Sequence, residues 1–274
     1  MKVGICGYGF VGKTYSDGLF KLGHEVRVYD PFKIAPKEYG KNYFEEVSAC
    51  PIIFLALPTI PKADGSEMDV SIIVETLEKL RGTDSIVIIK STVLPGATKK
   101  WCESFEIKNL IFMPEFLSER TAMFDFMTQD RIIIGTVGRV DCRGLFQLFK
   151  DIKCPKIVTD STTAEFLKFS SNILFATKVA FANQMKDIAD LKNVDWNEVK
   201  EILYMDSRIG QDHLTVYENK RGFGGHCLPK DLYQFTVDIE NCEKAKVYKT
   251  DVGFLRAIIN RNRVDRHKKK DWAE

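Results

Sequence analysis

Short runs of branched apolar residues alternate with amphipathic stretches over the first 160 residues of the chain. Six of these runs are predicted to form strands: Lys2–Cys6, Val26–Asp30, Ile52–Leu57, Ile86–Ile89, Leu110–Met113 and Ile132–Thr136. Several are uninterrupted, which is typical of strands that are covered on both faces. Helical patterns lie between them, including Gly12–Leu22, Ser71–Arg81 and Val140–Ile152. This alternation predicts an α/β domain with right-handed crossovers and a parallel, doubly wound sheet.

A different pattern begins after residue 160. The stretch Thr162–Asp190 is helical in character and contains no proline or glycine, and a second helix is expected at Asn197–Tyr204. Ser161 or Thr162 is a candidate cap for the long helix. A loop rich in glycine and polar residues follows over 207–230, and then more helix. We therefore expect an α/β domain over residues 1–160 and an all-helical domain over 161–274.

The composition narrows the class of protein. Of the 274 residues, 45% are hydrophobic and 28% are charged, as in ordinary globular domains. The net charge of +2 gives no reason to expect a nucleic acid partner. No apolar run reaches the length of a membrane span, and the N-terminus lacks the features of a secretory signal. Seven scattered cysteines fit neither a zinc site nor a disulfide framework, so we expect a soluble, cytoplasmic protein without a metal.

A glycine motif, Gly7-Tyr8-Gly9-Phe10-Val11-Gly12, directly follows the first predicted strand. In such a motif the first glycine permits a tight turn, the second lets the backbone approach a pyrophosphate, and the third allows close packing of helix and strand. Asp30 ends the second strand eighteen residues after Gly12, where a carboxylate accepts hydrogen bonds from ribose hydroxyls. A carboxylate there repels a 2′-phosphate. The sequence therefore predicts a dinucleotide site that prefers NAD to NADP.

A second motif, Gly222-Phe223-Gly224-Gly225-His226-Cys227-Leu228-Pro229-Lys230-Asp231, combines clustered glycines with a cysteine. Neighbouring cations activate thiolates, so Lys230 or His226 could make Cys227 a nucleophile. The alternative is a glycine-rich turn with an incidental cysteine, which this set of neighbours disfavours. His226 has no other histidine or cysteine at ligand spacing and is interpreted as a loop residue, not a metal ligand.

Polar residues on the long predicted helix form a third candidate site. Glu165, Lys168 and Asn172 are spaced i, i+3 and i+7, so all three project from one face. The ammonium and amide groups could both stabilise a developing oxyanion. A solvated face carrying a Glu–Lys pair explains the spacing equally well.

Further polar groups follow the third, fourth and fifth strands, at the sheet edge where open α/β sheets bind ligands. They belong to Pro58-Thr59, to Lys90-Ser91-Thr92 and to the loop Pro114–Glu119, which contains two carboxylates. Each group taken singly is an ordinary loop residue.

Together these segments resemble the UDP-glucose/GDP-mannose dehydrogenase family. The resemblance runs from Met1 to about Asn262 and includes the glycine motif, Leu57–Thr59, Ser91–Gly96, Pro114–Glu119, Ala164–Lys168 with Asn172, Asp206–Gly210 and Gly222–Asp231. It implies an N-terminal Rossmann-type domain followed by a helical domain that forms a homodimer. It also implies that a sugar-nucleotide alcohol is oxidised twice, to a carboxylate, with two NAD consumed and UDP-glucose as the favoured substrate.

The resemblance also assigns roles to individual residues. Cys227 is expected to form a thiohemiacetal and then a thioester, Lys168 and Asn172 to stabilise oxyanions, and Asp231 with a water near Thr92 to handle the alcohol proton. Glu115, or with less support Glu119, is expected to activate water for thioester hydrolysis. The residues expected to bind NAD are Gly7, Gly9, Phe10, Val11, Gly12, Asp30, Lys33, Thr59, Thr92, Glu119 and Lys230. Those expected to bind the sugar nucleotide are Phe116, Leu117, Lys168, Asn172, Arg208, Phe223 and Gly224.

Three features depart from the family pattern. Family members continue into a second Rossmann-like domain, the stretch from Arg208 to Cys227 is longer than usual, and His226 resembles the branch that oxidises UDP-N-acetylmannosamine. GDP-mannose and UDP-N-acetylmannosamine therefore stay open as substrates, as does a non-catalytic NAD-binding subunit. The β-hydroxyacid dehydrogenases share the layout and a helix lysine, but they need no cysteine, so the Gly222–Asp231 motif disfavours them.

Overall fold

A computed structural model describes residues 1–62, 65–225 and 227–266. The chain folds as two compact units. The first comprises Met1–Ile60 and Asp69–Lys168, and the second comprises Pro61–Met68 and the chain from Phe169 onward. The units divide within the long helix α7 (Ser161–Leu191), whereas the sequence places the domain boundary near residue 160.

The first unit contains a seven-stranded sheet in the order β2-β1-β3-β4-β5-β6-β7. Its strands are β1 (Lys2–Cys6), β2 (Glu25–Tyr29), β3 (Ile52–Leu55), β4 (Ile86–Ile89), β5 (Leu110–Phe112), β6 (Ile132–Thr136) and β7 (Lys156–Asp160). The predicted α/β class is confirmed, and all six predicted strands are present. β7 was not among the predicted strands, because its residues are mostly exposed and form no long apolar run.

One strand pairing corrects the expectation of a wholly parallel sheet. β5 and β6 pair antiparallel, with Ile111 opposite Thr136, while the other neighbouring strands pair parallel. The connection between β5 and β6 contains only the six-residue helix α5 (Ala122–Met127). The chain between these two strands does not return along the sheet, as a parallel crossover would require.

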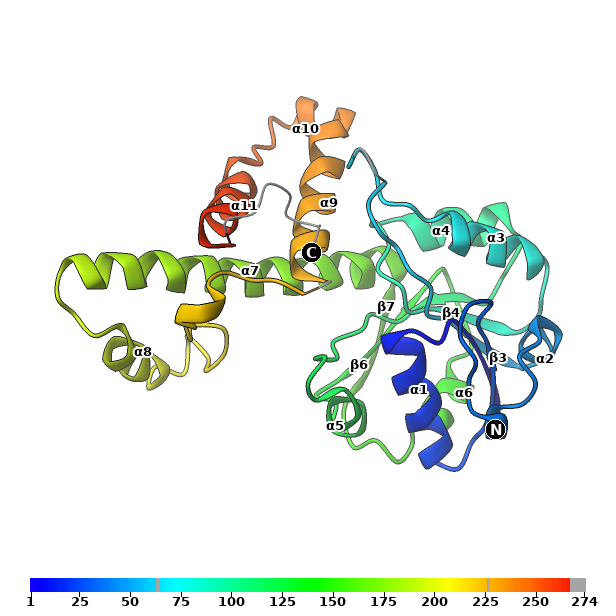
Figure 1. Ribbon diagram of the computed structural model, residues 1–274. Helices are drawn as coiled ribbons and strands as arrows, with labels where there is room; N and C mark the ends of the chain where they lie inside the picture. The colour runs from blue at the N-terminus through cyan, green and yellow to red at the C-terminus, as the bar shows by residue number, and fades with distance from the viewer. Residues whose placement is uncertain (63–64, 226, 267–274) are drawn as a thin grey trace. The chain divides into compact units, whose positions relative to one another are not determined.

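Helices cover both faces of this sheet (Figure 1). On one face α1 (Phe10–Lys21), α5 and α6 (Arg143–Leu148) contribute Leu19, Phe126 and Leu148 to a buried core. On the other, Val47, Ile73, Leu77 and Trp101 come from α2 (Phe44–Ser48), α3 (Ser71–Lys79) and α4 (Ala97–Ser104). A short 3-10 turn, η1 (Lys37–Tyr39), follows β2. The helix predicted over Val140–Ile152 is shorter than expected, because its last apolar residues enter the core from a turn.

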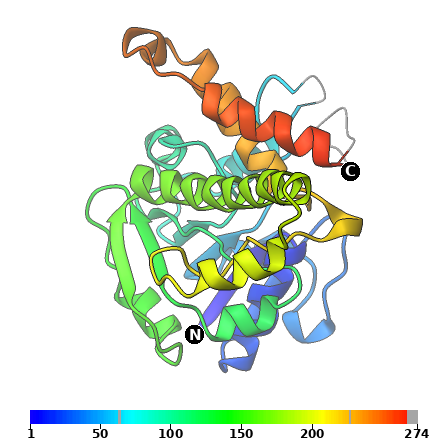
Figure 2. The same cartoon turned by 90° about the vertical axis from the view of Figure 1, so that its left-hand side faces the viewer.

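The second unit is helical within its described residues. α7 contains 31 residues. Figure 2 shows that it is a single uninterrupted helix. It is followed by α8 (Trp196–Tyr204), the 3-10 turn η2 (Glu218–Lys220), α9 (Leu228–Asn241), α10 (Glu243–Val247) and α11 (Gly253–Arg266). Phe223, Leu232, Ile258 and Ile259 pack with alanines of α7 to form a core. Among the described residues, no helix combines the length and apolar character needed to cross a lipid bilayer.

The cap of α7 differs from the one expected. The side chain of Asp160, the residue before the helix, accepts hydrogen bonds from the Thr163 amide at 3.0 Å and from the Thr163 hydroxyl. The expectation that Ser161 or Thr162 caps the helix is therefore wrong, because α7 begins one residue earlier than predicted and places Asp160 at the capping position.

Candidate active site

The three glycines of the N-terminal motif occupy three different environments. Gly7 has a φ of +95°, which favours glycine, and forms the turn after β1. A Cβ atom on Gly12 would lie 1.9 Å from the Gly7 carbonyl oxygen, so this position tolerates no side chain. A Cβ on Gly9, at the start of α1, would meet no atom within 4 Å. The open space therefore lies at the glycine that was predicted to approach a pyrophosphate.

Asp30 holds the glycine turn against the end of β2. One carboxylate oxygen of Asp30 accepts the Tyr8 amide at 2.7 Å, and the other accepts the amides of Phe32 and Lys33 at 2.8 and 3.0 Å. The carboxylate is thus fixed next to the turn at the mouth of α1. A carboxylate oxygen can accept two hydrogen bonds, so the oxygen that accepts only the Tyr8 amide keeps capacity for a ribose hydroxyl. Phe10 and Lys33 are exposed, and Val11 is half-buried.

The rim residues after β3 and β4 differ in accessibility. Thr59 is buried and Thr92 is half-buried. Ser91, next to Thr92, donates its hydroxyl to the Leu57 carbonyl at 2.7 Å and accepts the Leu57 amide at 2.8 Å. This pair of bonds joins the ends of the two strands, so Thr92 is carried by a fixed segment.

The loop after β5 folds around its own carboxylate. Glu115 is half-buried, and its Oε1 accepts the amides of Phe116 and Leu117 at 2.7 and 2.8 Å. Glu119, near the end of the loop, is exposed. The Arg131 guanidinium lies 4.8 Å from the centre of the Phe116 ring. The structure therefore distinguishes the two acidic residues, because Glu115 is held in place and Glu119 faces solvent.

Two buried lysines contact this loop. Lys168, on α7, donates its Nζ to the Glu115 carbonyl at 2.5 Å. Lys90, directly after β4, donates to the Pro114 carbonyl at 3.0 Å and lies 3.2 Å from Oε2 of Glu115. From the sequence alone, Lys90 is an ordinary polar residue at the end of a strand. The available signal was its place directly after the apolar run Ile86–Ile89, where an ammonium group becomes buried.

The face of α7 that carries Glu165, Lys168 and Asn172 is buried, so its interpretation as a solvated face is wrong. Glu165 does not pair with Lys168. Its carboxylate accepts the Gly96 amide at 2.5 Å and the Thr98 amide at 2.8 Å, at the start of α4. Burial raises the pKa of Glu165, and the hydrogen bonds from these amides oppose the rise. Glu165 is therefore a cap for α4, a role that its spacing in the sequence did not predict.

In the second unit, Asn172 and Asp231 form a buried pair. Asn172 donates its side-chain amide to Asp231 at 2.6 Å, and Lys230 donates its Nζ to the other Asp231 oxygen at 2.5 Å. Asp231 is fully buried in the first turn of α9, where the helix dipole favours negative charge. The structure thus brings together three residues that the sequence analysis placed in the site.

Cys227 immediately precedes α9 and is exposed. Its backbone carbonyl accepts the Asp231 amide at 2.9 Å, which ties the cysteine to the first turn of the helix. Cys6 is buried, unlike Cys227, and burial raises the pKa of the Cys6 thiol to about 12. His226 lies outside the described residues. Of the seven cysteines, all of which are described, Cys227 alone is exposed, so it is the best candidate nucleophile.

The remaining predicted substrate contacts lie in other settings. The Phe223 ring is buried in the core of the second unit, and its amide donates to the Asn262 side chain at 2.8 Å. Gly224 is half-buried. Arg208 is exposed and forms an ion pair with Asp206 at 2.5 Å. Phe223 therefore stabilises the loop that precedes Cys227, while the Arg208 guanidinium faces solvent.

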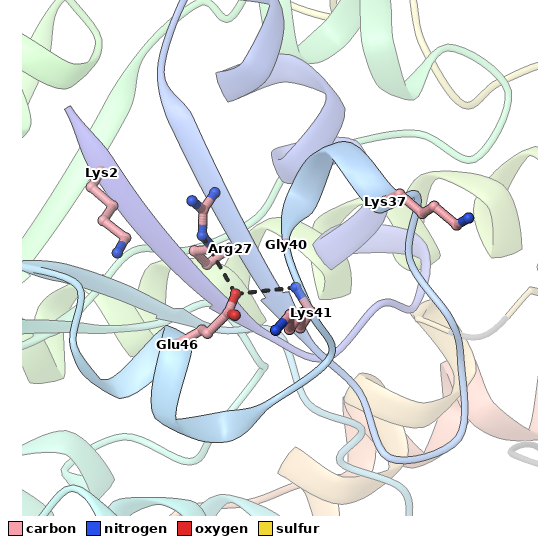
Figure 3. A pocket seen from close by; sticks show the side chains of 6 residues that line it. All are labelled: Lys2, Arg27, Lys37, Gly40, Lys41 and Glu46. Atoms are coloured by element: carbon pink, nitrogen blue, oxygen red, sulfur yellow. Dashed lines mark hydrogen bonds and ion pairs between the residues drawn. The ribbon is translucent and has the colours of Figure 1, made fainter.

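A separate hollow of about 700 Å³ lies on the first unit (Figure 3). It is lined by Lys2, Arg27, Lys37, Gly40, Lys41 and Glu46. Figure 3 shows Glu46 between Arg27 and Lys41, and Arg27 also forms an ion pair with Glu25 at 2.5 Å. None of the predicted site residues lines this hollow, and Arg27 is engaged by Glu25, by Glu46 and by the Val26 carbonyl.

Comparisons with known proteins cover most of the chain. Residues 37–153 match the NAD binding domain of the UDP-glucose/GDP-mannose dehydrogenase family, and residues 162–263 match its central domain. The UDP-glucose 6-dehydrogenase of Rickettsia bellii is 32% identical over 300 residues, which cover 96% of this chain and 67% of that protein. The GDP-mannose 6-dehydrogenase of Azotobacter vinelandii is 29% identical over 277 residues, which cover 85% of this chain and 63% of that protein.

A solved structure agrees with these matches. The UDP-glucose dehydrogenase from the hyperthermophilic archaeon Pyrobaculum islandicum superposes with a TM-score of 0.81 and 26% identity, over 96% of this chain and 68% of that one. The chain therefore spans about two thirds of the length of the relatives it matches. The match to both domains and the identity to the Rickettsia enzyme show that the chain belongs to the UDP-glucose/GDP-mannose dehydrogenase family, with an NAD-binding N-terminal domain.

Proposed function

We propose that this chain catalyses the NAD-dependent oxidation of a sugar-nucleotide 6-hydroxyl to a carboxylate, with UDP-glucose as the preferred substrate. The observation that carries the proposal is the exposed Cys227 at the start of α9, followed by Asp231, which forms a buried pair with Asn172 and bonds to the half-buried Lys230. A single alcohol oxidation needs no cysteine, whereas oxidation to an acid profits from a covalent thioester.

The first unit supplies the cofactor site. The open space at Gly9, the start of α1 and the Asp30 carboxylate fit the pyrophosphate and ribose of a dinucleotide. We assign Gly7, Gly12, Phe10, Val11, Lys33, Thr59, Thr92, Glu119 and Lys230 to the same role on the family pattern. NAD, when bound, accepts the two hydrides that the overall reaction releases.

Asp231 and Asn172 handle the first oxidation. The 6-hydroxyl loses its proton through a water held near Asp231 and Thr92, and its carbon loses a hydride, which leaves an aldehyde. Lys168 and Asn172 are donors one helical turn apart on α7. Both can stabilise negative charge on the substrate oxygen.

Cys227 makes the second oxidation possible. Its thiolate forms a carbon–sulfur bond to the aldehyde carbon, and the resulting thiohemiacetal loses a second hydride and a proton to become a thioester. The start of a helix favours the thiolate form. Water then cleaves the carbon–sulfur bond, Glu115 takes its proton, and Cys227 is restored. In total, one alcohol, two NAD⁺ and one water give one carboxylate, two NADH and three protons.

A second copy of the chain is the proposed partner. Phe166, Leu174, Phe181 and Ile188 on α7 are 40–57% exposed and repeat every seven or eight residues. Such a repeat places them along one face of the helix over about 33 Å. An exposed apolar stripe of this length supports a homodimer that packs α7 against its counterpart.

The first experiment measures NADH formed from limiting UDP-glucose, GDP-mannose and UDP-N-acetylmannosamine in parallel. We expect two NADH per UDP-glucose, and two per molecule of another sugar nucleotide would reassign the substrate. If all three give no turnover while NAD still binds, a non-catalytic subunit replaces the enzyme proposal.

Replacing the nucleophile tests the covalent step. In Cys227→Ser we expect acid formation to fall by at least about a thousandfold, with NAD affinity unchanged. Cys242→Ser, at the other end of α9, is the matched control and should keep wild-type activity. Wild-type yield of the acid from Cys227→Ser would disprove the thioester route.

A further inference from the structure

Lys90 is a buried cation that the proposed reaction does not use. Its side chain is 1% exposed, directly after the apolar strand β4. A buried ammonium group is costly unless it is paired and hydrogen-bonded. The contacts that keep Lys90 in this position therefore indicate what it does.

Lys90 contacts the loop after β5 and one aromatic ring of α1. The Lys90 Nζ donates to the Pro114 carbonyl at 3.0 Å, lies 3.2 Å from Oε2 of Glu115, and lies 4.4 Å from the centre of the Tyr15 ring. Burial lowers the pKa of Lys90, and the charge of Glu115 opposes this shift, while that of Lys168 adds to it. Burial, and then the charge of Glu115, raise the pKa of the Tyr15 hydroxyl. The charge of the Glu115 carboxylate thus affects the pKa values of both Lys90 and Tyr15.

The Glu115 carboxylate is fixed from two directions. Oε1 accepts the amides of Phe116 and Leu117, which come from its own loop. Oε2 faces Lys90, which comes from the end of a different strand. The same lysine holds the Pro114 carbonyl, and Lys168 holds the next carbonyl along the chain. The two lysines therefore bind two successive backbone carbonyl groups. Lys90 also forms an ion pair with the Glu115 carboxylate.

We propose that Lys90 is a positioning residue, which holds the Glu115 carboxylate in its orientation. The consequence for catalysis rests on the proposed function, in which Glu115 takes the proton of the water that cleaves the thioester. Without Lys90 the earlier oxidation steps should continue, because they use Cys227, Asn172 and Asp231. Hydrolysis should become slow, so the enzyme should accumulate as the thioester.

The first test needs no turnover. Lys90→Met removes the ammonium group, and Lys100→Met, an exposed lysine of α4, is the matched control. By amide hydrogen exchange we expect Phe116 and Leu117 to exchange at least about tenfold faster in Lys90→Met, with Tyr8 unchanged. Unchanged exchange at Phe116 and Leu117 would overturn the inference, whatever the enzyme oxidises.

The second test measures hydrolysis of the thioester. With UDP-glucose, Lys90→Met should release a burst of two NADH per subunit and then turn over at least about tenfold more slowly than wild type. Intact-mass analysis should find the substrate acyl group on Cys227. A residue with a merely structural role would lower the burst itself, and that result would also overturn the inference.

A double substitution covers the case in which Lys90→Met fails to fold. Lys90→Met with Glu115→Gln removes both charges, which is less costly than leaving one buried and unpaired. If Lys90 acts through Glu115, this double variant should hydrolyse the thioester as slowly as Glu115→Gln alone. A further loss of about tenfold or more would assign Lys90 a role independent of Glu115. Failure of wild type to oxidise any sugar nucleotide would refute the proposed function and leave the exchange result to decide the role of Lys90.

Discussion

The substitution Gly12→Ala tests the packing of α1 against the glycine turn. Its Cβ would lie 1.9 Å from the Gly7 carbonyl oxygen and 2.9 Å from the carbonyl carbon, so α1 must move outward. Overpacking of this kind costs about 1–3 kcal/mol, and a clash with backbone places it at the upper end. Alanine in a helix recovers about 1 kcal/mol. We therefore expect the free energy of unfolding to fall by about 2 kcal/mol.

Urea unfolding followed by circular dichroism measures this loss, and Gly9→Ala is the matched control. A Cβ at Gly9 meets nothing within 4 Å, and its φ of −75° suits alanine. Stability should therefore change by less than about 0.5 kcal/mol. NAD affinity should nevertheless fall about tenfold to a hundredfold, since the methyl group occupies the approach to the pyrophosphate. Wild-type stability of Gly12→Ala, or wild-type NAD affinity of Gly9→Ala, would refute the reasoning for that glycine.

Two further predictions concern α7. Glu165→Gln should lower the free energy of unfolding by about 1–3 kcal/mol, because an amide accepts with one oxygen only. Since the pKa of Glu165 is raised, its contribution is complete below the ordinary carboxyl pKa and declines as pH rises. The wild-type advantage in urea titrations should thus be smaller at neutral pH than in acid, and a larger advantage would contradict it. Leu174→Glu should convert the proposed dimer into a monomer in sedimentation measurements, with the exposed Ile202→Glu as control; an unchanged dimer would exclude this face.

Local features of the fold were predictable from the sequence. The glycine turn and Asp30 depend on residues close to one another in the chain or on adjacent strands, and the structure brings them together. The antiparallel direction of β6 was not predictable, because its apolar run resembles those of the parallel strands. The cap of α7 was misplaced by one residue, since serine, threonine and aspartate at 160–162 are all good caps.

The buried charges were the least predictable part of the candidate site. Glu165 and Lys168 have a spacing that fits a solvated ion pair, yet each is buried and bonded to a different backbone segment. Lys90 finds its partners in a loop that is distant in sequence. Helical spacing specifies which side chains share a face, whereas the packing of other segments decides whether that face meets water.

The continuity of α7 has a consequence for the spacing of two proposed substrate contacts. Lys168 belongs to the first unit and Asn172 to the second, yet both stand on one unbroken helix. Their Cα atoms are separated by about 6 Å along its axis through helix geometry alone, so no interface has to form to set this spacing. The helix alone thus fixes the distance between the two residues. A single residue inserted between them would turn Asn172 by about 100° about the helix axis.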